Sequence, residues 1–85
     1  MTVMYLYLLQ NNISKIFYIG TTNDINRRLR EHNSKGRHFT NRVTGEWELI
    51  NFKELSDEVA KLEEKRLKKS KNKKYIEWYF RNLSP

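Results

Sequence analysis

Two short apolar segments on either side of a polar turn constrain the fold of this chain most. The first covers residues 3–9 and reads VMYLYLL, and the second covers residues 16–19 and reads IFYI. Their lengths and their β-branched and aromatic side chains are typical of strands. The polar residues 10–12 between them favour a turn. The two segments therefore predict an antiparallel hairpin whose first strand is buried on both faces, and Gly20 is expected to end the second strand.

Alternation within the first strand assigns its side chains to two faces. Tyr5, Tyr7 and Leu9 share one face, whereas Leu6 and Leu8 share the other. The chain has 85 residues, among them five Tyr, four Phe and two Trp, which provide enough apolar area for one small core. We therefore expect a single domain over residues 1–85.

The composition narrows the classes of protein to which the chain can belong. There is no Cys, which excludes disulfides and thiolate metal ligands and favours a cytoplasmic protein. The longest apolar run, Met4 to Leu9, is too short to cross a bilayer, so no membrane segment is expected. Lys and Arg number 17 against 10 Asp and Glu, and the net charge of +7 favours a polyanionic partner such as nucleic acid. A solvated basic surface is the simpler alternative.

A helix is predicted after the hairpin, capped by Asn23 and ending near Asn33. Its apolar residues, Ile25 and Leu29, lie on one face, and that face also carries one arginine and one histidine. The other charged residues of the helix are expected to point elsewhere: Arg27, Arg30 and Glu31.

The two polar residues on the apolar face are Arg28 and His32. A buried guanidinium needs an anion or a hydrogen-bond acceptor. Without one, its burial costs on the order of several kcal/mol, as judged from the transfer of such groups from water to an apolar medium. A salt bridge to the sheet or a snorkelling side chain would satisfy Arg28 without any function. The alternative is that Arg28 and His32 line a cleft.

Residues 34–46 are polar and are interpreted as a loop. Lys35, Arg37, His38 and Arg42 give this loop cationic groups that could follow a phosphate backbone. An ordinary surface loop explains the same residues equally well.

The rest of the chain predicts a third strand over residues 47–52, a helix from the N-cap Ser56 to about Lys69, and a C-terminal helix. The apolar stripe of the middle helix is expected to consist of Val59, Leu62 and Leu67. The C-terminal helix carries a stripe that suits a core better than a base-stacking surface: Tyr75, Ile76, Tyr79, Phe80 and Leu83.

The order β-β-α-β-α-α cannot form a doubly wound sheet. We therefore expect an α/β protein of the α+β type, in which helices pack on a small antiparallel sheet. Glu63 and Glu64 both border the stripe of the middle helix, and periodicity does not choose between them. A glutamate on a basic helix usually pairs with a lysine at i+4 and remains in water, and Glu64 could pair with Lys68 in this way.

Five segments in this order, with these spacings, resemble the GIY-YIG nuclease superfamily, and most closely its short single-domain members. The segments are Tyr5-Leu6-Tyr7, Tyr18-Ile19-Gly20, residues 21–33 (TTNDINRRLREHN), Trp47-Glu48-Leu49, and residues 60–68 (AKLEEKRLK). The first motif departs from the family pattern, because Tyr5 replaces its glycine. Each motif alone is weak, but the ordered set is specific.

The resemblance implies a three-stranded antiparallel sheet flanked by helices, and a catalytic site made by Tyr7, Tyr18, Arg28, His32 and Glu64. It selects Arg28 rather than Arg27, and Glu64 rather than Glu63, with Glu64 as the ligand of Mg²⁺ or Mn²⁺. Tyr7 is expected to accept the proton of the attacking water, with a pKa lowered by nearby cations. Tyr18 would orient this group, Arg28 would bind the phosphate, and His32 would share proton handling or bind phosphate.

The resemblance therefore implies a metal-dependent endonuclease, with DNA favoured over RNA and a role in DNA repair or recombination. Low sequence specificity is expected because 85 residues leave no room for a separate DNA-reading domain. A protein partner could supply specificity. The residues expected to bind nucleic acid are Arg27, Lys35, Arg37, His38, Arg42, Lys65, Lys68 and Lys69. Two alternatives remain: a catalytically silent nucleic-acid-binding module of the same fold, and a basic structural protein such as a ribosome-associated factor.

Overall fold

The first two strands form the predicted hairpin, and the third strand joins it on the other side. The computed structural model describes residues 3–34 and 45–82. Its elements, in chain order, are β1 (Val3–Asn11), β2 (Phe17–Thr22), α1 (Ile25–Asn33), β3 (Trp47–Ser56), α2 (Asp57–Ser70) and α3 (Lys73–Asn82). The α+β class and the order β-β-α-β-α-α are as predicted.

The sheet is antiparallel throughout, with strand order β2-β1-β3. Because β1 is the central strand, residues 6–9 are buried on both faces, as their unbroken apolar sequence predicted. Tyr7 pairs with Gly20 on one side and with Phe52 on the other. The middle of β1 is therefore enclosed by neighbouring strands on both edges and by packed side chains on both faces.

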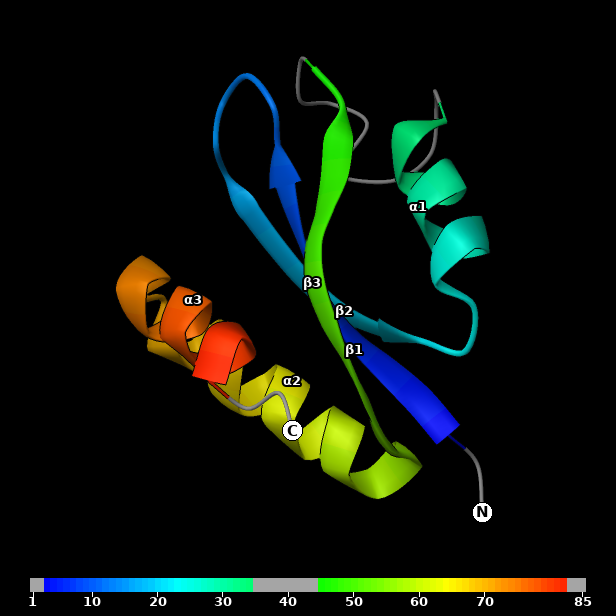
Figure 1. Cartoon of the computed structure of the whole chain (residues 1–85), viewed down its shortest axis with the longest axis vertical. Helices are drawn as coiled ribbons and strands as arrows, with labels where there is room; N and C mark the ends of the chain where they lie inside the picture. The colour runs from blue at the N-terminus through cyan, green and yellow to red at the C-terminus, as the bar shows by residue number, and fades with distance from the viewer. Residues whose placement is uncertain (1–2, 35–44, 83–85) are drawn as a thin grey trace.

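Each face of the sheet has its own core, and Figure 1 shows α1 on one side of the sheet with α2 and α3 on the other. One core lies under α2 and α3, and its buried residues are Leu6, Leu8, Ile19, Leu67, Ile76, Tyr79 and Phe80. The other lies beside α1, where Tyr7, Leu9 and Trp47 are buried with Tyr18, Leu29 and Leu49 packed against them. This division confirms the alternation of β1 and the core role of Tyr75, Ile76, Tyr79 and Phe80. Leu83, the last member of the predicted stripe, lies outside the described residues.

Several boundaries differ from the sequence-based predictions. Asp24, rather than Asn23, caps α1, because its carboxylate accepts a hydrogen bond from the Arg27 backbone N–H at 3.1 Å. The strand β2 continues through Gly20 to Thr22, since Gly20 remains paired with β1. The strand β3 continues past Phe52 to Ser56 for the same reason, because β1 is long enough to pair with all of it.

The helix α2 begins as predicted, with the Ser56 hydroxyl accepting from the backbone N–H of Val59. The predicted stripe is right for Leu67 but wrong for Val59 and Leu62, which are exposed. The line that faces the sheet instead runs through Ala60 and Leu67, which are fully buried. Small Ala60 lets the helix approach the sheet closely. None of the helices within residues 3–34 and 45–82 is long and apolar enough to span a bilayer.

Candidate active site

The hydroxyl of Tyr7 is the point where β1 and α1 meet. It lies 3.0 Å from Nε2 of His32, and it accepts a hydrogen bond from Nε of Arg28 at 3.4 Å. Arg28 and His32 are four residues apart on α1, so both project from the same face toward the sheet. His32 is buried. The two polar side chains that were predicted on the apolar face of this helix therefore contact a tyrosine of the central strand.

Gly20 provides the space that the Tyr7 side chain occupies. The two residues are paired across β1 and β2. A Cβ atom on Gly20 would overlap the phenol oxygen of Tyr7 and would lie 2.6 Å from its ring carbon Cζ. The phenol therefore lies directly over the backbone of β2, which only a residue without a side chain permits.

Tyr18 forms the aromatic wall of the same cluster. Its ring centroid is 4.6 Å from that of His32, in an edge-on arrangement, and 6.4 Å from that of Tyr7. The Trp47 ring packs edge-on against Tyr18, with ring centroids 6.1 Å apart. Tyr18 is only half-buried, so one side of its ring faces out of the cluster. We refer to the group made by Tyr7, Tyr18, Arg28 and His32 as the tyrosine–histidine cluster.

Arg28 is held in place by a carboxylate from its own helix. Its Nη1 lies 2.8 Å from Oε1 of Glu31, and Nε of Arg27 lies 3.7 Å from the other oxygen of Glu31. Glu31 was expected to point elsewhere, and that expectation is wrong, because a turn of helix brings residues i and i+3 together. The bond to Glu31 and the bond to Tyr7 both raise the pKa of Arg28, so the guanidinium keeps its charge.

The Tyr7 hydroxyl does not have the lowered pKa that the sequence analysis expected. Burial raises the pKa of Tyr7, and the nearby Arg28 only partly offsets this effect. The carboxylate of Glu64 adds to the increase through its negative charge. Tyr7 is consequently a neutral phenol at ordinary pH, in hydrogen-bond contact with an imidazole nitrogen.

Glu64 approaches the cluster from the opposite face of the sheet, past the edge strand β2. Its Oε1 accepts a hydrogen bond from the Thr21 hydroxyl at 3.1 Å, and its Oε2 lies 2.7 Å from Nζ of Lys68. Glu63 points the other way, toward Arg66 and Tyr79. The two glutamates that periodicity could not separate therefore have different surroundings, and only Glu64 adjoins β2.

A hollow of about 360 Å³ lies between Arg28 and Thr21, the residue that donates to Glu64. Its lining consists of Met4, Thr21, Thr22, Asn23, Arg27 and Arg28. We call it the arginine hollow. Two arginines line this hollow, and Thr21, which also lines it, donates to the Glu64 carboxylate. Arginine side chains are suited to binding phosphate oxygens.

The residues present suit one hard divalent cation held weakly. Glu64 contributes carboxylate oxygens and Thr21 a hydroxyl oxygen, which are the donors that Mg²⁺ and Mn²⁺ prefer. Lys68 now neutralises one of those oxygens, but its side chain is about half exposed and can move into water. Within the part of the chain that the structure describes, no three His, Asp or Glu side chains gather into a preformed metal cluster. A cation here would need oxygens from water and substrate.

A family model described as the GIY-YIG catalytic domain matches residues 3–76. The chain belongs to the GIY-YIG family. The matched span begins with β1, ends within α3, and includes every member of the tyrosine–histidine cluster together with Glu64. Neither the curated proteins nor the solved structures gave a match.

GIY-YIG proteins form a nuclease superfamily that generally acts as endonucleases on nucleic acid and generally depends on divalent metal. Of the residues predicted to bind nucleic acid, Arg27 lines the arginine hollow. The predicted lysines of α2, Lys65, Lys68 and Lys69, are exposed. The predicted loop residues Lys35, Arg37, His38 and Arg42 lie outside the described residues.

Two residues of this site were not predicted from the sequence: Thr21 and Glu31. Thr21 was quoted only as part of a motif, although alternation along β2 places it on the same side of the sheet as Ile19 and therefore toward α2. Glu31 was expected to point away from the face of Arg28, although its spacing of three residues from Arg28 was a sufficient signal for the contact.

Proposed function

We propose that this GIY-YIG protein is a metal-dependent endonuclease that hydrolyses phosphodiester bonds, with DNA favoured over RNA. One observation carries the proposal: Tyr7, His32 and Arg28 meet on one side of β2, and Glu64 reaches the same strand from the other side. Phosphodiester hydrolysis needs a group that takes a proton from water, a cation for the phosphoryl oxygens, and help for the leaving oxygen. The cluster and Glu64 together provide the first two.

Arg28 and Arg27 would bind the non-bridging oxygens of the phosphate in the arginine hollow. The guanidinium of Arg28 offers a planar pair of donors that matches two phosphate oxygens. Glu31 now holds that guanidinium, so the substrate phosphate would compete with Glu31 for Arg28 or share it. The carboxylate also fixes the guanidinium before substrate arrives, which reduces the entropy lost on binding.

Tyr7 and His32 would move the proton of the attacking water. As the oxygen of water bonds to phosphorus, Tyr7 takes the proton of that water and passes its own phenol proton to Nε2 of His32. The bond from phosphorus to the leaving oxygen breaks, the leaving oxygen takes a proton from solvent, and His32 later returns its proton to solvent. This relay suits a phenol whose pKa is raised by burial, because the phenolate need not persist.

Glu64 would hold the divalent cation, with the Thr21 hydroxyl beside it. A cation bound there would polarise the phosphate and stabilise the leaving oxygen. Lys68 is an ammonium group already in place on Glu64, and its departure from the carboxylate would leave it free to meet a neighbouring phosphate.

Low intrinsic sequence specificity follows from the chemistry of these groups. Guanidinium, ammonium and metal-bound carboxylate contact phosphate, which carries no sequence information. We therefore propose that sequence or site selection comes from substrate shape or from a protein partner. A cytoplasmic role in DNA repair or recombination fits an enzyme of this kind.

The second candidate is a nucleic-acid-binding module without activity. It is favoured by one feature, which is that both key charges are already neutralised within the protein, Arg28 by Glu31 and Glu64 by Lys68. A cleavage panel separates the two candidates. Labelled DNA and RNA, each in single-stranded, duplex and branched form, are incubated with the protein in Mg²⁺, in Mn²⁺ or in chelator. Cleavage in either metal but not in chelator supports the nuclease, whereas binding without cleavage in every arm supports the module.

A further inference from the structure

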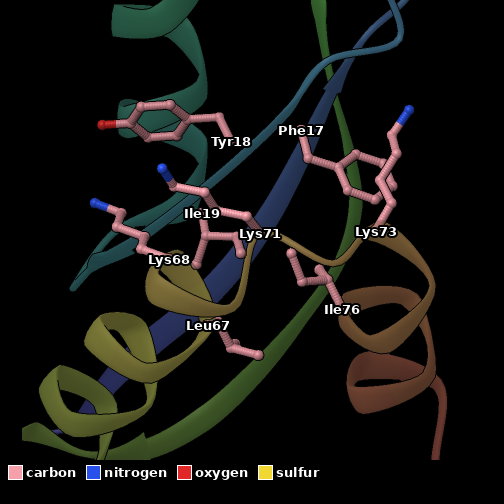
Figure 2. Close-up of a pocket in the computed structure, with 8 residues that line it drawn as sticks. All are labelled: Phe17, Tyr18, Ile19, Leu67, Lys68, Lys71, Lys73 and Ile76. Carbon is pink, nitrogen blue, oxygen red and sulfur yellow. The ribbon is translucent and has the colours of Figure 1, made fainter.

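A second hollow lies on the outward side of Tyr18, where β2, the end of α2 and the start of α3 meet (Figure 2). Its volume is about 280 Å³, and its lining consists of Phe17, Tyr18, Ile19, Leu67, Lys68, Lys71, Lys73 and Ile76. We call it the lysine hollow. None of the site residues predicted from the sequence lies in it except Tyr18 and Lys68.

The lysine hollow has an apolar floor and a cationic rim. Ile19, Leu67 and Ile76 are buried core residues and form the floor. Lys68 and Lys71 lie toward Tyr18, and Lys73 lies beside Phe17 (Figure 2). Its lining, within the part of the chain that the structure describes, contains three ammonium groups and no carboxylate. Such a space suits a ligand that has an anionic group for the rim and a flat apolar part for the floor.

The rim lysines already lie over the aromatic rings of this hollow. Nζ of Lys73 lies 4.8 Å from the centroid of Phe17, and Nζ of Lys68 lies 5.5 Å from the centroid of Tyr18. Lys71 ends α2 in the left-handed conformation, with φ of 53°, which turns the chain sharply between the two helices. That turn brings a third ammonium group to the same rim.

The lysine hollow is continuous with the proposed active site through two shared residues. Tyr18 lines this hollow and also contacts His32, with ring centroids 4.6 Å apart. Lys68 lines this hollow and also pairs with Glu64 at 2.7 Å. A nucleic-acid strand whose phosphate lies at Glu64 would therefore pass next into the lysine hollow.

We propose that the lysine hollow binds one unpaired nucleotide adjacent to the scissile phosphate, and so selects substrates with single-stranded character at the cleavage site. Lys71 and Lys73 would bind its phosphate, and its base would lie against Phe17 and the apolar floor. Basic groups combined with aromatic surfaces are how proteins hold single strands. A duplex keeps its bases stacked inside and could use only the lysines. The inference rests on the proposed function, since it takes the scissile phosphate to lie at Glu64.

The test measures binding separately from cleavage. The full chain is titrated in chelator, which prevents metal-dependent cleavage, with a fluorescent single-stranded oligonucleotide, a blunt duplex of the same length, and anionic phospholipid vesicles. The variant Lys71→Ala/Lys73→Ala is compared with Lys61→Ala/Lys74→Ala, which removes the same charge from positions in α2 and α3 that lie outside the hollow. All four lysines are exposed, so both variants should keep the fold, and circular dichroism checks this.

We expect wild type to prefer the single strand, and Lys71→Ala/Lys73→Ala to lose about tenfold in affinity for it at moderate salt. The control variant should lose clearly less. A second variant, Phe17→Leu, keeps an apolar side chain. It should lower the affinity for the single strand about fivefold and leave the affinity for the duplex unchanged, as expected when a base loses its aromatic stacking partner.

Three results would overturn the proposal: equal losses in the two lysine variants, a loss in Phe17→Leu that is the same for single strand and duplex, or binding to vesicles in place of oligonucleotide. Failure of the nuclease would look different. A selective, Lys71- and Lys73-dependent preference for single strands without any cleavage in Mg²⁺ or Mn²⁺ would support the hollow and remove the nuclease. Cleavage that is unaffected by substitution of Lys71, Lys73 and Phe17 would support the nuclease and remove the proposed role of the lysine hollow.

Discussion

The phenol oxygen of Tyr7 and Nε2 of His32 lie 3.0 Å apart, although 25 residues separate them in the chain. The pairing depends on three elements: the central strand that carries Tyr7, the helix that carries His32, and Gly20 of the edge strand, which makes room for the phenol. Because both partners are buried, their hydrogen bond is shielded from competing water. A fixed contact of this kind is what a proton relay requires.

Replacing Gly20 by alanine should disrupt this contact. The new Cβ would overlap the Tyr7 hydroxyl, and the neighbouring atom is part of a rigid ring held by the core. We expect a loss of about 1–3 kcal/mol in the free energy of unfolding, as is usual for overpacking. Urea denaturation measures that loss, and the His32 resonances in NMR report the altered contact. An unchanged stability together with unchanged His32 resonances would contradict the close packing of Tyr7 on Gly20.

Arg28→Lys should impair cleavage almost as much as Arg28→Ala, because lysine keeps the charge but loses the planar fork. We expect both variants to lose about 100-fold or more in single-turnover rate, the scale seen when one transition-state donor is removed. Arg30→Ala is the matched control, since Arg30 is an exposed residue of the same helix. Full activity in Arg28→Lys would show that charge alone suffices, and equal losses in all three variants would point to non-specific binding.

Glu64→Gln should abolish binding of divalent cation, whereas Glu63→Gln should not. Glu64 has the Thr21 hydroxyl beside it, but Glu63 is engaged with Arg66. Titration with Mn²⁺ in the presence of a non-cleavable oligonucleotide, followed by water proton relaxation, measures binding without any turnover. If Glu63→Gln also lost the cation, or if Glu64→Gln kept it, the assignment of the metal ligand would be wrong.

The raised pKa of Tyr7 makes a prediction for alkaline pH. Burial favours the neutral phenol in the folded protein, so its contribution to stability is complete below the ordinary tyrosine value of 10.0 and is lost as pH rises through the higher folded value. Tyr79, whose pKa is also raised by burial and by Glu63, acts in the same direction. Stability should therefore decline above about pH 10.

Denaturation of wild type and of Tyr7→Phe at pH 8, 10 and 11 isolates the part due to Tyr7. Lysine deprotonation occurs in the same range, but it affects both proteins equally. As the pH rises, the unfolding free energy of wild type should fall more than that of Tyr7→Phe. A difference that stays constant from pH 8 to pH 11 would contradict the raised pKa.

The parts of this structure that sequence could predict are those governed by a local period. The alternation of β1 separated Tyr7 from Leu6 correctly, and the turn of α1 placed Arg28 beside His32 on the inner face. Prediction from local sequence failed where pairing or packing with a neighbouring element determined the structure. The strand β3 continues past Phe52 through polar residues, because on an edge strand the pairing with β1, rather than apolar character, sets the length.

The candidate site shows the same limit. Periodicity could not choose between Glu63 and Glu64, since both border the buried line of α2, and the difference lies in Thr21, a residue 43 positions from Glu64. The pKa of Tyr7 was expected to fall, because the sequence displays the cations but does not display how deeply the phenol is buried. The choice that periodicity left open and the wrong pKa expectation both concern properties that exist only after the strands and helices have packed.

The central claim is that groups from the two faces of the sheet act on one phosphate, and a double-mutant cycle tests it most directly. Single-turnover cleavage of one labelled substrate in Mg²⁺ is measured for wild type, Tyr7→Phe, Glu64→Gln and the double variant. Residues that work as a unit lose their contributions together rather than additively. The account predicts that each single variant loses about 100-fold or more, and that the double variant is scarcely slower than the slower single variant. A double variant whose loss is the product of the two single losses would contradict it, as would wild-type rates in both single variants.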